Sequence, residues 1–177
     1  MKYIKSKKYG NIGEAEMLKR IQKQYPKAYI DDIGKANSNW DIWIPEIQMG
    51  IEVKMDYKSK ETGNLVIEVE MSGKLSALSL TKAKYWVFVT GYDYIWITPL
   101  DIYRFLEQHF EYGRVPFTGD GDDNEKIAHL IGLNRFLDYV RKLNKEQAWI
   151  ETIKENDVLY YDNMMKLLIK LKENEKI

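Results

Sequence analysis

Short apolar runs with the composition of β-strands lie in close succession along the first hundred residues of the chain. They are rich in Ile, Val, Trp and Met, and most are followed at once by Gly, Pro, Asp or Ser, which is typical of strands that end in tight turns. Runs this short favour a β-sheet over buried helices. The predicted strands are residues 28–33, 40–44, 49–55, 65–71, 85–89 and 94–97, the last two forming a hairpin around Gly91.

Segments whose apolar residues have helical spacing precede and follow these strands. In the first predicted helix Ala15, Leu18 and Ile21 share a face, and Pro26 ends it. The predicted helices are residues 13–25, 100–110, 125–143, 145–154 and 157–172. The order of a helix, adjacent strands and further helices predicts an α+β fold with a mixed sheet. We expect a single domain over residues 1–177, with a core at about 10–112 and a helical C-terminal part at about 113–177.

The composition limits the chemistry that the chain can perform. It has no Cys, which excludes disulfides, thiol catalysis and thiolate metal sites. His109 and His129 are its two His residues, too few for a His-rich zinc site, so any metal should be a hard cation held by oxygen ligands. The 27 basic residues balance the 27 acidic ones, which argues against a nonspecific nucleic-acid coat but allows a local basic surface.

The sequence has the pattern of neither a signal peptide nor a membrane span. The basic stretch 1–10 is not followed by an apolar segment, and the most apolar stretch, 85–100, is interrupted by Gly91, Asp93 and Pro99. We therefore expect a cytoplasmic protein with no membrane partner.

Charged residues recur on one side of the predicted strand 49–55. Strand periodicity puts Glu52, Lys54 and Asp56 on one face and the apolar residues on the other. In the preceding strand, Asp41 lies within an apolar run, where a carboxylate is costly unless it is paired, hydrogen-bonded or bound to metal. If the two strands form a hairpin, Asp41 and Glu52 can converge on one cation beside Lys54. Two carboxylates and a lysine suit phosphodiester hydrolysis, because carboxylates hold Mg²⁺ and an ammonium stabilises charge on phosphorus.

Asp41 followed by the tripeptide Glu52-Val53-Lys54 resembles the PD-(D/E)xK nuclease superfamily, which includes restriction endonucleases, phage nucleases and Holliday-junction resolvases. Trp40 stands where the proline of that motif would be, although the family often lacks this proline. The resemblance covers about residues 10–100. It implies a restriction-endonuclease-like core of a helix and a central mixed sheet, followed here by a helical extension.

The resemblance also implies roles for individual residues. Asp41 and Glu52 would bind the metal, with the carbonyl of Val53 as a further ligand. Lys54 would activate or position the attacking water, and Glu14, on the first helix, would order the metal shell. The implied cofactor is Mg²⁺ or Mn²⁺, and the implied substrate is DNA, in the cytoplasm of a prokaryotic or phage-infected cell.

Three lysines that follow the motif are candidate DNA contacts. Lys74, Lys82 and Lys84 lie in a segment rich in Ser and Thr, which resembles a stretch seen after the active-site hairpin in phage-type members. Exposed lysines around a helix capped by Thr81 are the plain alternative. A homodimer would cut both strands most easily, and the apolar face of residues 157–172 is a candidate dimer surface.

Simpler interpretations stay open for the acids. Glu52 and Lys54 could form a solvated hairpin face, with Glu68 and Glu70 as cross-strand ion-pair partners. Glu68 could instead join the metal shell as an additional acid. Glu14 could be favoured by a helix N-terminus without any function. For the whole protein, the alternatives are a nuclease-like fold that binds nucleic acid without cleavage and a protein-interaction module.

Overall fold

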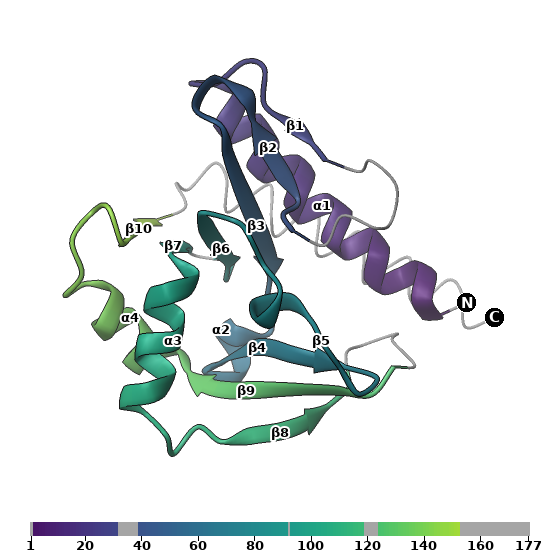
Figure 1. The fold of residues 1–177 in the computed structure, drawn as a ribbon, viewed down its shortest axis with the longest axis vertical. Coiled ribbons are helices and arrows are strands. Elements are labelled where there is room, and N and C mark those ends of the chain that lie inside the picture. Colours follow the sequence, from purple (N-terminus) through teal and green to yellow (C-terminus); the bar gives the residue numbers. More distant parts are fainter. Residues whose placement is uncertain (1, 32–38, 92, 119–123, 153–177) are drawn as a thin grey trace.

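Two β-sheets and helices on both sides of the larger sheet make up the fold (Figure 1). The computed structural model describes residues 2–31, 39–91, 93–118 and 124–152, with the backbone alone for residues 2–11. The larger sheet is mixed and has six strands, whereas the smaller one is antiparallel and has four. The predicted α+β class with a mixed sheet is therefore confirmed.

The six-stranded sheet consists of β1 (Tyr29–Ile30), β2 (Ile42–Ile44), β3 (Met49–Met55), β6 (Tyr85–Val89), β7 (Asp93–Ile97) and β10 (Ala148–Thr152), side by side in this order. Neighbouring strands are antiparallel, except that β3 and β6 run parallel. Every residue of β6 is buried, which is typical of a central strand covered on both faces.

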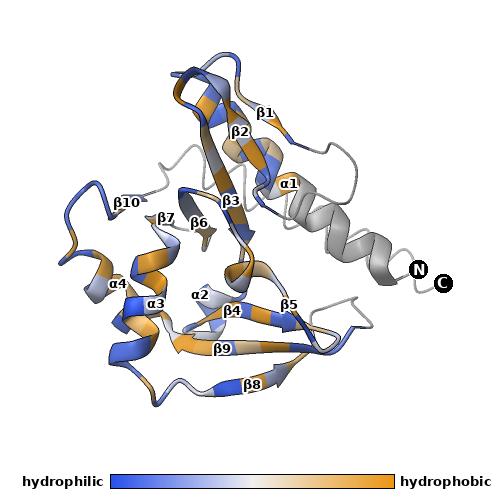
Figure 2. Ribbon diagram, in the orientation of Figure 1, coloured by the Kyte–Doolittle hydropathy of each residue, from blue (hydrophilic) through white to orange (hydrophobic). Residues whose placement is uncertain are grey.

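The four-stranded sheet has the order β5 (Lys74–Leu75), β4 (Asn64–Met71), β9 (Lys126–Gly132) and β8 (Arg114–Phe117). Leu65, Ile67 and Val69 of β4 are buried in the core, while the residues between them are partly exposed. Figure 2 shows the resulting mixture of apolar and polar residues along β4 and β9. This alternation is the period-2 pattern of a sheet that packs on one side.

The helices are α1 (Lys2–Gln22), α2 (Ser59–Thr62), α3 (Pro99–Gln108) and α4 (Leu133–Val140), with 3₁₀ turns η1 (Pro45–Ile47) and η2 (Ala77–Ser79). Met17 of α1 packs with Ile51 and other apolar residues on one face of the six-stranded sheet. On the opposite face Phe88 of β6 makes edge contact with Phe136 of α4, which contacts Phe105 of α3. The apolar residues of β4 join this second cluster. The six-stranded sheet thus separates two hydrophobic cores.

Most strand predictions in the first hundred residues are confirmed. The predicted ranges 40–44, 49–55, 85–89 and 94–97 match β2, β3, β6 and β7 to within two residues, with β6 and β7 forming the predicted hairpin. The predicted strand 28–33 is represented by the shorter β1. The strand at 65–71 also exists, but as β4 it pairs with β5 and β9 and not with β3.

The prediction of a helical C-terminal part is right for α4, which lies within the predicted helix 125–143, and wrong for the other elements described there. Residues 126–132, predicted to begin a long helix, form β9, and residues 148–152 form β10 in place of a helix. The apolar residues of β9 fit helical spacing as well as a strand, so its pairing with β4 decides the structure. In β10, Trp149 stacks on Trp96 of β7 with ring centroids 4.9 Å apart. The predicted helix 157–172, and with it the candidate dimer surface, lies outside the described residues.

The first helix begins earlier than its spacing predicted. α1 starts at Lys2 and not at Gly13, and it ends at Gln22 before Pro26. Glu14 consequently lies inside the helix, so the helix N-terminus cannot account for it. Within the described residues, no helix has both the length and the apolar character needed to cross a bilayer.

Candidate active site

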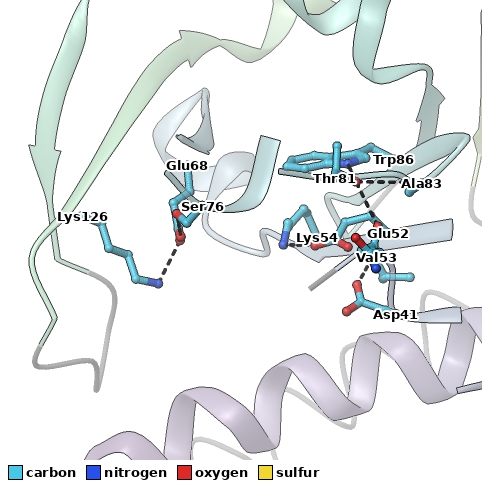
Figure 3. A network of polar contacts seen from close by, with 11 residues as sticks. Asp41, Glu52, Val53, Lys54, Glu68, Ser76, Thr81, Ala83, Trp86 and Lys126 are labelled. Carbon is cyan, nitrogen blue, oxygen red and sulfur yellow. Dashed lines mark hydrogen bonds and ion pairs between the residues drawn. The ribbon is translucent and has the colours of Figure 1, made fainter. Parts of the chain in front are cut away.

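Asp41 precedes β2 and folds its side chain onto β3. Its backbone N–H donates to the carbonyl of Ile51 over 2.9 Å, which fixes it beside β3. Its Oδ2 accepts a hydrogen bond of 2.7 Å from the backbone N–H of Val53, the contact drawn in Figure 3. The pairing of β2 with β3 begins at Ile42, so no residue of β2 pairs with Val53. The Asp41 carboxylate instead accepts from the Val53 N–H, which would otherwise need another partner. The residue that precedes β2 therefore places a carboxylate beside Glu52.

Glu52 and Lys54 lie on the face of β3 that also carries Trp86 of β6. The parallel register pairs Glu52 with Trp86, and parallel partners point to the same side of a sheet. Nζ of Lys54 lies 2.5 Å from Oε1 of Glu52 and 5.1 Å from the centre of the Trp86 ring. Glu52 is only 7 % exposed. Glu52 and Lys54 thus form an ion pair that lies against the face of the Trp86 ring. The interpretation of Glu52 as part of a solvated hairpin face is therefore wrong.

α1 brings Glu14 within electrostatic reach of Asp41. A Cβ on Gly13 would lie 3.2 Å from Cβ of Met55, so this glycine permits a close approach of α1 to β3. The charge of Glu14, the next residue, contributes to raising the pKa of Asp41. Acids from α1, β3 and the start of β2 therefore act on one another, although they are far apart in the sequence.

The electrostatics of this cluster raise the pKa of one acid and of the lysine. Burial, reinforced by the charges of Glu52 and Glu14, raises the pKa of Asp41 to about 7, although Lys54 and the Val53 N–H oppose the shift. Burial alone would lower the pKa of Lys54, but the carboxylates of Glu52, Asp41 and Glu68 outweigh it and raise that pKa. At neutral pH Lys54 is therefore an ammonium, which can donate and stabilise negative charge but cannot act as a base.

Glu68, the possible additional acid, belongs to β4 in the second sheet. Its Oε1 accepts a hydrogen bond of 2.6 Å from Ser76 Oγ, and its Oε2 lies 3.0 Å from Nζ of Lys126 (Figure 3). β3 and β4 do not pair, so Glu68 and Glu70 are not cross-strand partners of Lys54 or Lys58. Glu68 nevertheless influences the pKa of Lys54, which places it close to the cluster across the two sheets.

The three predicted DNA-contacting lysines are exposed but dispersed. Lys74 lies on β5, at an edge of the four-stranded sheet. The backbone N–H of Lys82 donates to the carbonyl of Asn39 over 3.0 Å, and that of Lys84 donates to Gly50 over 2.8 Å. Lys82 and Lys84 therefore flank the β2–β3 region, whereas Lys74 belongs to the other sheet. Thr81 caps no described helix, since η2 ends before it and β6 follows.

The donors that meet here fit a hard cation. Asp41 and Glu52 supply carboxylate oxygens, the ligands that Mg²⁺ prefers, and the charge of Glu14 acts on Asp41. Burial and the charge of Glu52 raise the pKa of Asp41, so added positive charge would favour its ionised form. As they stand, the described residues hold no group of three or more His, Asp or Glu side chains arranged around one ion position. In this arrangement Glu52 is bound to Lys54 and Asp41 to Val53, so a cation would have to displace or supplement these contacts.

Sequence reasoning missed two residues that lie at or near the candidate site, Trp86 and Lys126. Trp86 is fully buried like the other core aromatics, yet its ring also lies under the Lys54 ammonium. The indole N–H of Trp86 donates to Thr81 Oγ1 over 3.1 Å, which fixes the ring. Lys126 gave no signal, because its segment was predicted as a helix. The parallel pairing of β3 with β6 is the one cue that could have revealed Trp86.

Comparison with known proteins gave no matching family model, no matching curated protein and no matching solved structure. Function must therefore be argued from the chemistry of the site itself.

Proposed function

We propose that this protein is a metal-dependent endonuclease that hydrolyses phosphodiester bonds in DNA through Asp41, Glu52 and Lys54. The observation that carries the proposal is the convergence of a buried carboxylate, Glu52, a half-buried one, Asp41, and the Lys54 ammonium where β2 begins beside β3. Charged groups are costly to bury, and clusters with strongly perturbed pKa values occur most often at functional sites.

The proposed roles follow from the chemistry of each group. Asp41 and Glu52 would hold Mg²⁺ or Mn²⁺, together with the carbonyl of Val53, and Glu14 would order that set of ligands. The cation supplies neutralisation of the phosphate charge and lowers the pKa of a nearby water. Asp41 must lose its proton to act as a ligand, because a neutral carboxyl is a poor donor to a hard cation.

Lys54 would act as an ammonium. Its raised pKa keeps it charged, so it would hold the attacking water or a phosphate oxygen and stabilise the charge that develops on phosphorus. The Trp86 face beneath it limits the positions that the ammonium can take, which is useful for a group that must meet a transition state.

A helix followed by a mixed sheet, with the motif on adjacent antiparallel strands, is consistent with membership of the PD-(D/E)xK superfamily, which is part of the proposal. Lys82 and Lys84, near the β2–β3 region, are the proposed contacts to the DNA backbone, with Lys74 further away. A homodimer and a cytoplasmic location complete the proposal.

The test is cleavage of a panel of nucleic acids by the full chain: supercoiled plasmid, linear duplex, single strand, four-way junction and RNA, each with Mg²⁺, Mn²⁺ or EDTA. Cleavage of at least one DNA substrate, lost in EDTA and in the variants Asp41→Ala and Lys54→Ala, is the expected result. Lys142→Met, at an exposed position after α4, is the matched control for loss of a positive charge. Full activity in either site variant would refute the assignment, and binding of DNA without any cleavage would select the noncatalytic alternative.

A further inference from the structure

A second polar cluster, formed by Glu68, Ser76 and Lys126, lies on the four-stranded sheet beside the candidate active site (Figure 3). The three residues come from β4, the segment after β5, and β9. Glu68 has one carboxylate oxygen on Ser76 and the other on Lys126, so both of its acceptors are engaged. This engagement makes Glu68 a residue that holds a lysine in place more readily than a metal ligand.

Lys126 is held in an unusual way for a lysine. Its side chain is only 17 % exposed, and its ammonium lies 3.0 Å from Glu68, whose side chain is 21 % exposed. Long lysine side chains normally keep their rotamer freedom at a surface, and freezing one is unfavourable in entropy. An ammonium fixed before its ligand arrives binds that ligand with a smaller entropic loss.

The backbone of β4 departs from regular pairing at this position. The register between β4 and β9 shifts between Glu68 and Glu70, which is a β-bulge. Bulges redirect side chains and are frequent next to active sites. Lys126 is paired with Met71, beyond the bulge, yet its ammonium reaches back to Glu68. The bulge thus lies next to the Glu68–Lys126 contact that fixes the lysine.

The cluster faces the candidate site, since the side chains of Lys126 and Lys54 point toward one another in Figure 3. Glu68 contributes to the raised pKa of Lys54, so the two groups are within electrostatic reach although they belong to different sheets. A nucleic-acid strand carries its phosphates in a regular row, so a strand whose scissile phosphate lies at Lys54 brings another phosphate to a neighbouring cation.

We infer that Lys126, positioned by Glu68 and Ser76, binds the phosphate next to the one at Lys54 and thereby makes an oligonucleotide a better substrate than an isolated diester. The inference rests on the proposed function, because that function places the scissile phosphate at Lys54. The binding of a nucleic-acid backbone by Lys126 can nevertheless be measured without cleavage. Lys126 would be a phosphate-binding residue, while Glu68 and Ser76 would be positioning residues.

The decisive experiment measures affinity of the full chain for a fluorescein-labelled DNA oligonucleotide in EDTA at several salt concentrations. Lys126→Met should weaken binding several-fold and reduce the slope of log K against log salt by about one, as loss of one phosphate contact does. Lys126→Arg should retain most of the affinity, because it keeps the charge, and Ser76→Ala should lie between the wild type and Lys126→Met. Lys142→Met should match the wild type. An unchanged affinity and slope in Lys126→Met, at an unchanged melting temperature, would overturn the inference.

Cleavage separates this inference from the proposed function. With Mg²⁺ or Mn²⁺, Lys126→Met should raise KM for the oligonucleotide while the turnover of bis(p-nitrophenyl) phosphate stays at the wild-type value, since that small diester has no neighbouring phosphate. Equal losses on both substrates would show that Lys126 acts on the reacting phosphate, which contradicts the inference. If the wild type cleaves neither substrate, the proposed function fails, and the binding measurement still decides whether Lys126 contacts the backbone.

Discussion

Nζ of Lys54 lies 2.5 Å from Oε1 of Glu52, in a pair whose carboxylate is almost fully buried. Lys54 is therefore a positive charge that the chain itself supplies to the site. Its charge compensates Glu52, which leaves Asp41 as the acid that cannot ionise readily. This division between a compensated and an uncompensated carboxylate determines how stability, pH and metal should interact.

The first prediction concerns the ion pair itself. Lys54→Met leaves the Glu52 carboxylate buried without its partner, so we expect the free energy of unfolding to fall by about 2 kcal/mol. This loss is smaller than for a fully buried pair, because a third of the Lys54 side chain is exposed. Replacing Glu52 by Met as well should recover most of that loss. Urea denaturation of the wild type, both single variants and the double variant measures the coupling. A double variant as unstable as the sum of the singles would contradict it.

The second prediction concerns pH. The pKa of Asp41 is about 7 in the folded protein, compared with the ordinary value of 3.8. Between these values the folded state holds a proton that the unfolded state has lost, so stability is greatest below about pH 4 for this group and decreases as the pH rises to about 7. The full difference corresponds to about 4 kcal/mol.

Asp41→Asn removes this titration while keeping an oxygen that can accept from Val53. We expect this variant to be more stable than the wild type at pH 8, and the difference to shrink as the pH falls from 7 to 4. Urea denaturation at pH 5, 6, 7 and 8 measures it, with Asp138→Asn, at an exposed position on α4, as the control. A stability difference that does not change with pH would contradict the raised pKa.

The sequence predicted the parts of the fold that depend on local pattern. β2, β3 and the β6–β7 hairpin have clear strand periodicity and short turns, so Asp41, Glu52 and Lys54 could be brought together by a single hairpin. β9 could not be predicted in this way, because its apolar spacing fits a helix as well, and its partner β4 is distant in the sequence. Lys126 depends on that long-range pairing and was therefore not expected.

The third prediction concerns the contact that places Asp41. A Cβ added to Gly50 would lie 2.6 Å from Cδ2 of Trp40, whose ring stacks on Trp43 at 4.8 Å and whose N–H donates to Asp31 over 2.7 Å. Gly50→Ala should therefore displace Trp40 and lower the free energy of unfolding by about 2 kcal/mol. Because Trp40 adjoins Asp41, the variant should also lower the proposed nuclease activity.

Two further variants test the steric cause. Gly113→Ala should be close to neutral, since a Cβ there meets no atom within 4 Å. Gly50→Ala combined with Trp40→Leu should be less destabilised than the sum of the single changes, because the smaller side chain vacates the space that the new methyl needs. Strict additivity would show that the loss arises elsewhere.

The last prediction links metal to the protonation of Asp41. A cation held by Asp41 and Glu52 binds the folded state alone, so Mg²⁺ in large excess over its Kd should raise the melting temperature, by about 2–4 °C for each kcal/mol of linked stability in a chain of this size. The increase should be larger at pH 8 than at pH 5.5, because Asp41 carries a proton below a pKa of about 7 and that proton competes with the metal. Differential scanning fluorimetry with and without Mg²⁺ measures both effects. The increase should disappear in Asp41→Asn and Glu52→Gln but persist in Asp138→Asn, so an increase that survives in Glu52→Gln would place the ion elsewhere.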